Sequence, residues 1–398
     1  MNISVIDKLI IKCCPNGVNY KQLGEICYSL KKNTLKQTDL IKNGMYPVVN
    51  SGKELYGYYS SYNNEGDAFV IASRGEYAGF VTYMKDKFWA GGLCYPYTSK
   101  CNMSVLTKFI FYYLKNKERF IMDTLVARGG IPALNKGDID KFKIPVPPMP
   151  VQEEIVKILD TYSELEAELE AKLEAELDAR KKQYEYHLNQ LLSFDKNDKD
   201  IKFMPLGEIG TFIKGNGLQK KDFTDSGVGC IHYGQIYTYY GTYTQQTKSF
   251  VSEELAKKLK KAQKGDLIIA TTSENVEDVG KAVAWLGNES ICIGGHSTVF
   301  HHNQNPKYMA YLFQTEIFFK QKQKVAKGVK VIDISDKAMS KFKFGFPSIE
   351  EQERIVSILD ELNKLINEIS DSLQAEITAR KKQYEYYRNK LLTFKEAV

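Results

Sequence analysis

Few residues of this chain have the types and spacing that catalysis would need. Methyl transfer to adenine uses a Pro-Pro pair flanked by a polar residue and an aromatic ring, which together hold the flipped base. The only Pro-Pro pair, Pro147-Pro148, lies between Val146 and Met149. It offers neither the polar group nor the ring, so we interpret it as a rigid lead into the next element.

Other catalytic motifs are also incomplete. The segment 212–217 (FIKGNG) lacks a full G-x-G-x-x-G fingerprint, and no G-x-x-x-x-G-K-[ST] loop for nucleotide phosphates occurs. His296 and the pair His301-His302 have no third ligand at a spacing that suits a metal. The seven cysteines include no C-x-x-C pair. We therefore expect no catalytic residue and no metal site in this chain.

An internal repeat organises the sequence. Residues 152–194 align without a gap with residues 352–394, more than half of the aligned positions are identical, and the block ARKKQYEY occurs in both copies. Shorter matches, such as LGEI at residues 23–26 and 206–209, extend the repeat into the preceding segments. The order is therefore head, helix, head, helix. We place these domains at residues 1–147 (head 1), 148–195, 196–346 (head 2) and 347–398.

Both repeated segments have the pattern of long amphipathic helices. Leucine, isoleucine and tyrosine recur at three-, four- or seven-residue steps over residues 155–191 and 355–391. Pro150 suits the start of the first helix, and Ser348-x-x-Glu351 forms a capping box before the second. Such helices are about 60 Å long at about 1.5 Å per residue, too long for one small domain to cover. Each apolar stripe therefore needs a partner helix.

The expected fold class is α+β, with two β-rich mixed α/β heads. Runs such as FVIAS (69–73) and DLIIATT (266–272) have the composition of buried strands. Two helices with the same register pack naturally as an antiparallel coiled coil, which would separate the heads and give the chain a pseudo-twofold internal repeat. The alternative is that each helix packs only on its own head.

Charge is segregated along the chain. Lysine and arginine outnumber acidic residues in residues 1–150 and 196–345, whereas acidic residues dominate the two helical segments. The overall net charge of +6 is mild, so its distribution is the informative part. Basic heads suggest a polyanion, because lysine and arginine gain affinity for phosphates by releasing condensed counterions. The alternative for a basic run such as residues 257–264 is a solvated helix face.

Basic, polar and aromatic side chains in the heads are candidates for contact with DNA. Arginine can pair bidentately with guanine, and asparagine or glutamine with adenine, while tyrosine can stack or bind phosphate. For each single residue, packing is the competing explanation. The candidates are Lys31, Arg74, Tyr77, Arg128 and Asn135 in head 1, and Lys214, Asn216, Gln219, Lys220, Tyr233, Gln235, Tyr237, Ser273, Asn275, His296, Lys327 and Lys330 in head 2.

The sequence resembles the specificity subunits of Type I restriction-modification systems over nearly its whole length. The resemblance rests on the LGEI openings, on GDLIIA (265–270), and on ARGGIPALNKGDIDKFKIPVPP (127–148), which continues into QEEIVKILD. The second junction, SIEEQERIVSILD (348–360), is equally similar. One departure is AKGVKVID (326–333), which replaces the glycine-proline segment of head 1 and makes transfer of contact roles there uncertain.

The resemblance implies a non-catalytic subunit that recognises double-stranded DNA. Each head would be a target recognition domain for one half of a bipartite, asymmetric sequence. The helices would set the spacing and bind two methyltransferase subunits, and restriction-translocase subunits would complete the complex. This chain would bind no cofactor, since S-adenosylmethionine, ATP and Mg²⁺ would belong to the partners. The candidate partner-binding residues are Arg180, Lys181, Tyr184, Tyr186, Arg380, Lys381, Tyr384 and Tyr386.

A further pattern suggests how the spacing is set. Residues 165–176 contain LEAE, LEAK and LEAE in succession. Four helical residues span about 6 Å, comparable to about two base pairs at about 3.4 Å each. Helix-favouring composition is the alternative explanation.

The sequence contains no apolar segment long enough to cross a membrane. The longest apolar runs, such as residues 109–114, are far shorter than the roughly 20 residues of a membrane span, and charges interrupt the first twelve residues, so we expect a cytoplasmic protein. The competing functions are a stand-alone DNA-binding regulator with a coiled-coil scaffold, a scaffold that binds no DNA, and a self-sufficient methyltransferase. Specific DNA binding without partners would favour the regulator. Absence of DNA binding would favour the scaffold, and cofactor binding would favour the methyltransferase.

Overall fold

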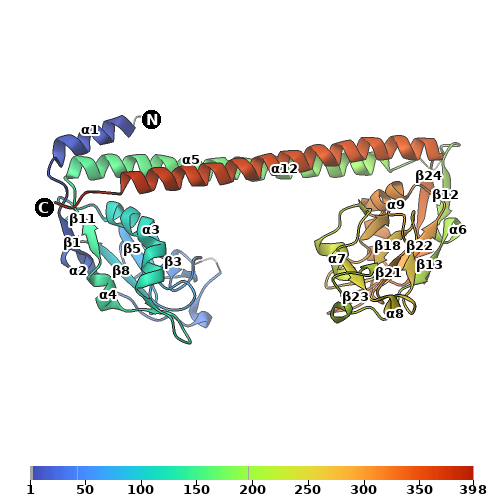
Figure 1. Ribbon diagram of the computed structural model, residues 1–398, viewed down its shortest axis with the longest axis horizontal. Helices are drawn as coiled ribbons and strands as arrows, with labels where there is room; N and C mark the ends of the chain where they lie inside the picture. The colour runs from blue at the N-terminus through green and yellow to red at the C-terminus, as the bar shows by residue number, and fades with distance from the viewer. Residues whose placement is uncertain (1–2, 43, 196, 398) are drawn as a thin grey trace. The chain divides into compact units, whose positions relative to one another are not determined.

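The computed structural model of the protein describes residues 3–42, 44–195 and 197–397 (Figure 1). The chain divides into two compact units. Unit 1 comprises Met1–Leu173 with Leu373–Val398, and unit 2 comprises Glu174–Ser372. Each unit therefore joins one head to parts of both long helices, α5 (Met149–Leu191) and α12 (Ile349–Leu391). The four domain boundaries placed from the sequence stay a prediction.

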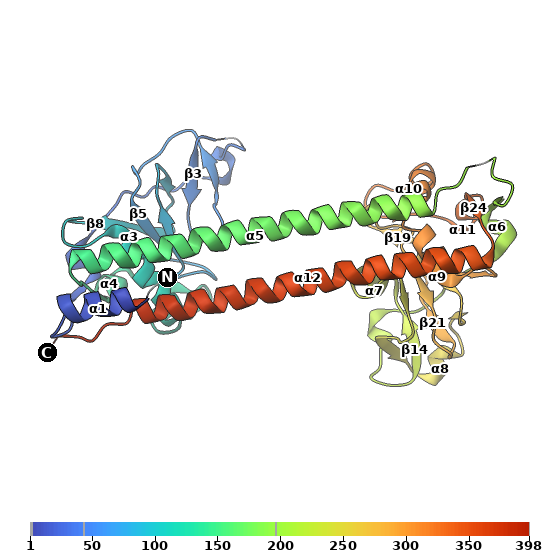
Figure 2. The same ribbon diagram turned by 90° about the horizontal axis from the view of Figure 1, so that it is seen from above.

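Head 1 consists of short strands with one longer helix, α3. Helix α1 (Ile3–Cys13) precedes it and lies against the C-terminal end of α12 (Figure 2). The other elements are β1 (Tyr20–Gln22), α2 (Leu23–Ile26), β2 (Cys27–Ser29), the 3-10 helix η1 (Gln37–Asp39), β3 (Tyr46–Val49), β4 (Gly57–Tyr59), β5 (Ala68–Ala72), β6 (Val81–Met84), β7 (Trp89–Ala90), β8 (Cys94–Ser99), α3 (Thr107–Thr124), β9 (Val126–Ala127), β10 (Ala133–Leu134), α4 (Lys136–Asp140) and β11 (Lys143–Pro145).

Head 2 has a similar succession of elements, with two shorter helices, α9 and α10, in the place of α3. The elements are β12 (Lys202–Pro205), α6 (Leu206–Ile209), β13 (Gly210–Lys214), the 3-10 helix η2 (Lys220–Asp222), β14 (Val228–Ile231), α7 (Tyr233–Thr238), β15 (Tyr243–Thr244), β16 (Ser249–Val251), α8 (Glu253–Ala256), β17 (Lys261–Ala262), β18 (Leu267–Ala270), β19 (Thr272–Ser273), β20 (Ala282–Trp285), β21 (Ile291–Ile293), β22 (Ser297–His302), α9 (Pro306–Leu312), α10 (Glu316–Gln323), β23 (Ile332–Asp333), α11 (Asp336–Met339) and β24 (Lys343–Phe346).

The sheets of the two heads share one topology. In head 1 the larger sheet has the order β2-β8-β5-β6, and in head 2 the order is β13-β22-β18-β20, with β15 added in parallel beside β20. The smaller sheet β4-β3-β7 corresponds to β16-β14-β21, which β17 extends. The ribbon β1-β11 corresponds to β12-β24. The expected α+β fold with an internal repeat is confirmed, and the repeat extends into strands whose sequences have little in common.

The repeated LGEI segment and a Gly-Asp pair found in both heads, at residues 66–67 and 265–266, have defined structural roles. Leu23 and Leu206 are fully buried, and each donates its backbone N–H to the carbonyl of the phenylalanine in the following Lys-Phe-Lys segment, at 2.9 Å in both heads. Gly66 and Gly265 precede the central strands β5 and β18 with φ angles of +111° and +95°. These are left-handed conformations that favour glycine. The short matches therefore mark a buried one-turn helix and a glycine turn that both heads use.

The long helices pack antiparallel within each unit, as expected. In unit 1, Tyr162 of α5 contacts Tyr384 of α12 at a ring separation of 6.3 Å, and Glu170 pairs with Lys381 at 2.6 Å. In unit 2, Leu188 of α5 shares a core with Leu359 of α12. No side chain over residues 160–187 and 360–387 is fully buried. The partner helix therefore covers only part of each apolar stripe.

The C-terminal end of α12 completes the core of head 1. Leu391 and Leu392 are buried in the same cluster as Leu23 and Phe109. Beyond the helix, the N–H of Val18 donates to the carbonyl of Lys395 at 2.8 Å, and the N–H of Ala397 donates back to Val18 at 3.0 Å. Head 1 is thus closed by the far end of the chain.

Head 2 is expected to lose stability in acid because of His302 in β22. Burial lowers the pKa of His302 from 6.5 to about 4 and outweighs the opposing effect of Asp266, and Nε2 has no hydrogen-bond partner among the described residues. The unfolded chain therefore binds the proton more readily than the folded chain. The free energy of unfolding should fall as the pH drops from 6.5 towards 4, by at most about 3 kcal/mol from this group.

The test is His302→Asn, which keeps an acceptor for the N–H of Gln304. The chain has two tryptophans, and Trp285 is buried in head 2, so a Trp89→Phe background makes its fluorescence a reporter of that head. Urea unfolding between about pH 7 and about pH 4.5 should show a weaker pH dependence in the variant. An identical dependence with and without His302 would contradict the assignment.

Candidate nucleic-acid interface

Four of the candidate residues in head 2 line one cleft. Tyr233 and Tyr237 of α7 face Ser273 and Asn275, which lie at and after β19, and Val331 closes the cleft from the next hairpin. Its volume is about 330 Å³. The sequence predicted that these residues lie near strands without showing that they meet. The cleft has aromatic walls and polar edges, which suit contact with bases.

A basic group extends this cleft. The ring of His296 lies 5.0 Å from that of Tyr233, which in turn lies 4.4 Å from the buried ring of His232. Burial lowers the pKa of His232, and the positive charges of Lys220 and His296 lower it further. Lys220 therefore brings positive charge close to the aromatic edge of the cleft, as expected for a surface that binds a polyanion.

Several candidate side chains already have hydrogen-bond partners within head 2. The amide of Asn216 donates to the carbonyl of Lys258 at 2.9 Å and accepts from the N–H of Lys260 at 2.8 Å. Gln235 caps α7 and donates to Ser249 at 2.7 Å. These amides fix loops, so a role in base recognition would require them to exchange partners.

Two other polar candidates are engaged in the same way. Tyr237 donates its hydroxyl to the carbonyl of Thr272 at 2.6 Å, and burial raises its pKa above the usual range. Asn275 donates to the carboxylate of Asp278 and accepts from its backbone N–H. Both groups hold the loop that follows β19 and leave mainly the ring of Tyr237 for the cleft.

The remaining candidates in head 2 are exposed. Lys214 ends β13 near Asp336, where its charge opposes the rise that burial causes in the pKa of that carboxyl. Gln219, Lys327 and Lys330 lie on exposed loops. Such lysines are free to meet phosphates, which position a protein on DNA without specifying sequence.

The candidates of head 1 are more dispersed. Arg74 is exposed and its backbone bridges to Ala133, while Tyr77 lies beneath the ammonium group of Lys53 at 5.0 Å. Arg128 forms an exposed ion pair with Asp123 at 3.0 Å. The two others lie elsewhere: Lys31 is exposed, and Asn135 caps α4 by accepting from the N–H of Gly137.

A buried glutamine, which the sequence motifs did not single out, joins each head to the start of a long helix. Gln152 is fully buried, donates to the carbonyls of Pro147 and Ser104 at 2.7 and 3.0 Å, and accepts from the N–H of Leu106 at 2.9 Å. In head 2, Gln352 is likewise fully buried: it donates to the carbonyl of Pro347 and to the side-chain oxygen of Gln304, and it accepts from the N–H of Asn305. Gln152 and Gln352 occupy identical positions of the repeat, and this identity is the sequence signal that could have identified them.

An aspartate two turns further on completes each junction. Asp160 accepts from the hydroxyl of Tyr112 and from the ammonium group of Lys108, at 2.5 and 2.7 Å. Asp360 accepts from Tyr311 and Lys307, both at 2.6 Å. Charge-assisted hydrogen bonds of this kind are directional. Each head is therefore fixed to its helix by the same Gln-and-Asp junction.

Comparison with known proteins agrees with this duplicated architecture. The family model of the Type I restriction modification DNA specificity domain matches residues 15–179 and 198–379, once for each head with its helix. The chain belongs to this family.

Individual relatives align over nearly the whole specificity protein. A putative type I restriction enzyme specificity subunit of Haemophilus influenzae is 31% identical, with 95% of this chain and 96% of that protein covered. The EcoR124I/EcoR124II specificity subunit of Escherichia coli is 28% identical over 95% and 94% of the two chains. A solved structure concerned with complex assembly of the type I R-M system shares the fold, with a TM-score of 0.71, 15% identity and coverage of 95% and 98%.

Family membership confirms the expected class of protein. The chain is a DNA specificity subunit, and the expectation that it is not itself an enzyme is confirmed because its relatives are specificity subunits of restriction enzymes. Among the described residues no helix is long and apolar enough to cross a membrane, and no group of three acidic, histidine or cysteine side chains could hold a metal ion. The assignment of individual residues to DNA stays a prediction.

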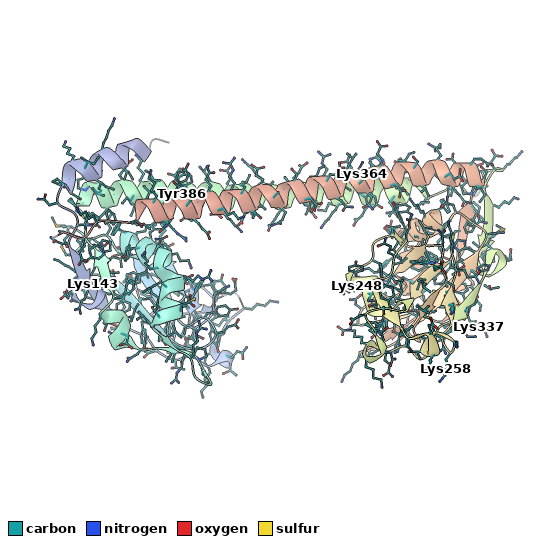
Figure 3. The ribbon with its side chains drawn as sticks, in the orientation of Figure 1. Lys143, Lys248, Lys258, Lys337, Lys364 and Tyr386 are labelled. Carbon is teal, nitrogen blue, oxygen red and sulfur yellow. The ribbon has the colours of Figure 1, made fainter. Side chains whose placement is uncertain are left out.

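The repeated block ARKKQYEY presents two different tyrosine faces in this specificity subunit. Tyr184 and Tyr384 are half-buried against the cores of head 2 and head 1. Tyr186 and Tyr386 point outward and are 62% and 65% exposed, and Tyr386 is marked in Figure 3. Two residues turn a helix by about 200°, which explains the contrast. Only the second tyrosine of each block is free to meet a partner.

The basic residues of the two ARKKQYEY blocks differ in their ion pairs. Arg180 pairs with Glu176 on its own helix, whereas Lys381 pairs with Glu170 of the facing helix. Arg380 lies near Glu376 at 3.6 Å, and Lys181 is exposed. Most of these charges are therefore partly neutralised within the helices.

Proposed function

We propose that each head recognises one half of a bipartite DNA sequence and that the helices set the gap between the halves. The observation that supports this most is the duplicated Gln-and-Asp junction, because it ties two dissimilar heads to two similar helices by corresponding contacts. A single recognition surface would not need two such attachments. Dissimilar heads imply an asymmetric target.

The proposed complex supplies the chemistry that this chain lacks. Two methyltransferase subunits would bind along the helices and methylate adenine N6 in each half of the target, and restriction-translocase subunits would cleave in an ATP-dependent reaction. S-adenosylmethionine, ATP and Mg²⁺ would be bound by those partners. The solved structure that shares this fold concerns complex assembly of a type I R-M system, which supports a multi-subunit assembly here. Such an assembly would act in the cytoplasm, where a prokaryotic cell keeps its DNA.

The proposal is tested by co-expressing this chain with the methyltransferase subunit encoded beside it. Single-molecule sequencing of the host genome should then show N6-methyladenine in one asymmetric motif of two parts with a fixed gap. Replacing head 2 by that of a relative should change one half of the motif and leave the other half intact. Specific DNA binding by the chain alone, with no methylation from the complex, would favour a stand-alone regulator instead.

Tyr186 and Tyr386 are expected to be anchors for the methyltransferase subunits. Exposed tyrosines on a helix are frequent energetic centres of protein interfaces, where truncation typically costs about 2 kcal/mol or more. Tyr186→Ala together with Tyr386→Ala should therefore weaken subunit binding at least about 30-fold, because about 1.4 kcal/mol corresponds to a factor of ten. The unfolding transition of the chain should stay unchanged, because both rings are mainly in solvent.

The matched control is Tyr184→Ala with Tyr384→Ala. These rings pack in the head cores, so their loss should lower the free energy of unfolding. Calorimetric titration with the methyltransferase subunit and urea unfolding separate the two effects. Full affinity in the Tyr186 and Tyr386 variant would remove these residues from the interface.

A further inference from the structure

Each head carries a short hairpin whose tip exposes aliphatic side chains to solvent. In head 1 the hairpin joins β9 to β10 and exposes Ile131 by 68%. In head 2 the corresponding hairpin precedes β23 and exposes Val329 by 96% and Val331 by 60%. Neither set of side chains contributes to a core, so the hairpins need another explanation.

The base of each hairpin is fixed to the end of a central strand. In head 1, the N–H of Leu134 donates to the carbonyl of Ser73, and the N–H of Gly75 donates to Pro132, both at 2.9 Å. In head 2, β23 pairs with β19, so that Ile332 lies opposite Ser273. The two hairpins therefore project from equivalent places in the repeated fold, and their bases are rigid.

The tip in head 2 is built tightly on glycine. Gly328 has a φ of +132°, and a Cβ atom there would lie 1.8 Å from the carbonyl oxygen of Val331. In head 1, a Cβ atom added at Gly129 or Gly130 would meet no atom within 4 Å, so that tip stands clear of the head. A narrow tip on a rigid base can enter a groove that a bulkier loop could not enter.

Positive charge accompanies the aliphatic side chains. Lys327 and Lys330 flank the tip in head 2, and Arg128 lies at the tip in head 1. Asp333 leaves a net charge of +1 over residues 327–333 in head 2, whereas in head 1 the ion pair with Asp123 offsets the charge of Arg128. The apolar tips, together with the basic flanks of the head 2 hairpin, match the surface of DNA, which offers phosphates outside and apolar base faces between the stacked pairs.

Equivalent placement distinguishes these side chains from ordinary surface residues. A single exposed aliphatic residue is common and requires no explanation. Here the two heads reach the same arrangement with different residues, since the tip segments 129–132 and 328–331 share only a glycine. Both tips also adjoin candidate DNA contacts, Arg74 and Ser273, through backbone pairing.

We propose that the two hairpins act as wedges, inserting Ile131 and the pair Val329 and Val331 between base pairs of the target. Apolar wedges of this kind partly unstack a base step and kink the duplex. The insertion would make the deformability of that step part of the recognised sequence. It would also open the stack before the partner subunits act on adenine. This inference rests on the proposed function, since it requires that the heads contact DNA.

The test uses the complex with its methyltransferase subunits and its mapped target. 2-Aminopurine, whose fluorescence rises when a base unstacks, is placed in turn at each position of both half-sites except the methylated adenine. The wild-type complex should give one bright step in each half. Val329→Ser with Val331→Ser should abolish the bright step in one half only, and Ile131→Ser in the other half only. Each variant should weaken target binding at least about tenfold, or about 1.4 kcal/mol.

Met103→Ser is the matched control, because Met103 is 88% exposed in head 1 and belongs to the loop that Gln152 holds at the helix junction. It should leave both signals and the affinity unchanged. Absence of any bright step in the wild-type complex, or intact steps in the hairpin variants, would overturn the wedge and leave DNA recognition standing. Loss of methyltransferase binding in the hairpin variants would overturn it in favour of a subunit contact. No binding of DNA by the wild-type complex would instead refute the proposed function.

Discussion

Lengthening both long helices by four residues is expected to widen the gap in the DNA target by about two base pairs and to leave both half-sites unchanged. Leu-Glu-Ala-Glu would follow Leu173 in α5, and Leu-Gln-Ala-Glu would follow Ser372 in α12, at the boundary between the two units in each helix. Four residues add about 6 Å, and one base pair adds about 3.4 Å. Four is also close to the 3.6 residues of a helical turn, so the apolar faces stay nearly in register.

Both helices are lengthened in this variant because each unit holds parts of both of them. Tyr162 meets Tyr384 in unit 1, and Leu188 shares a core with Leu359 in unit 2. The helices have 43 residues each, so the two paths between these contacts are matched. The tetrapeptide pattern itself lies in α5, so one tetrapeptide inserted there alone is also expected to lengthen the gap without altering either half-site.

Mapping of N6-methyladenine in cells that express each variant provides the measurement. The paired insertion should abolish methylation of the original motif and create one with the longer gap. A paired insertion of Gly-Gly-Ser-Gly has the same length without helical rigidity and serves as the control, and it should not create a single new gap. Altered half-sites with an unchanged gap would show that the helices do not measure the spacing.

Removing the buried amide at one junction is expected to destabilise one head selectively. Gln352→Leu deprives the N–H of Asn305 and the carbonyl of Pro347 of their partner in a fully buried site. An unsatisfied buried group costs about 1 to 3 kcal/mol, so the loss should be about 3 kcal/mol or more in the free energy of unfolding of head 2. Leucine is similar in volume, so the effect reports hydrogen bonds rather than a cavity.

The repeat supplies its own control for this substitution. In the Trp89→Phe background, Trp285 fluorescence should show the earlier transition for Gln352→Leu and an unchanged transition for Gln152→Leu, which affects head 1. Gln374→Leu lies on the exposed surface of α12 and should change neither. Equal destabilisation of head 2 by the Gln152 and Gln352 variants would show that the junctions are not specific to their heads.

The repeat and the helices could be predicted from sequence because both depend on local pattern. Apolar residues spaced three or four positions apart predict α5 and α12 whatever the helices pack against. The predicted start near Pro150 agrees with Met149 as the first helical residue. The strand topology of the heads could not be derived in this way. Strands such as β5 and β18 are central in their sheets because of distant partners, and a run of apolar residues does not name those partners.

The candidate site was predictable in part. Tyr233, Tyr237, Ser273 and Asn275 were chosen by residue type and do share a cleft. Residue type could not reveal that the amide of Asn275 is committed to Asp278 or that the amide of Asn216 holds another loop. Such hydrogen bonds join segments separated in sequence or depend on a turn, so they become visible only with the fold. Gln152 and Gln352 were missed because a polar residue in a helical repeat suggests an exposed position.

The closure of head 1 by the end of α12 has a consequence for the order of folding during synthesis. The core of head 1 contains Leu391 and Leu392, and Val18 pairs with residues that follow them. A ribosome produces these partners only after it has made all of head 2, whose own core is complete once residues 355–359 have emerged. Native contacts of such long sequence separation form slowly. The first head to be translated is therefore the last to be completed, and part of its apolar surface stays uncovered for the longest time.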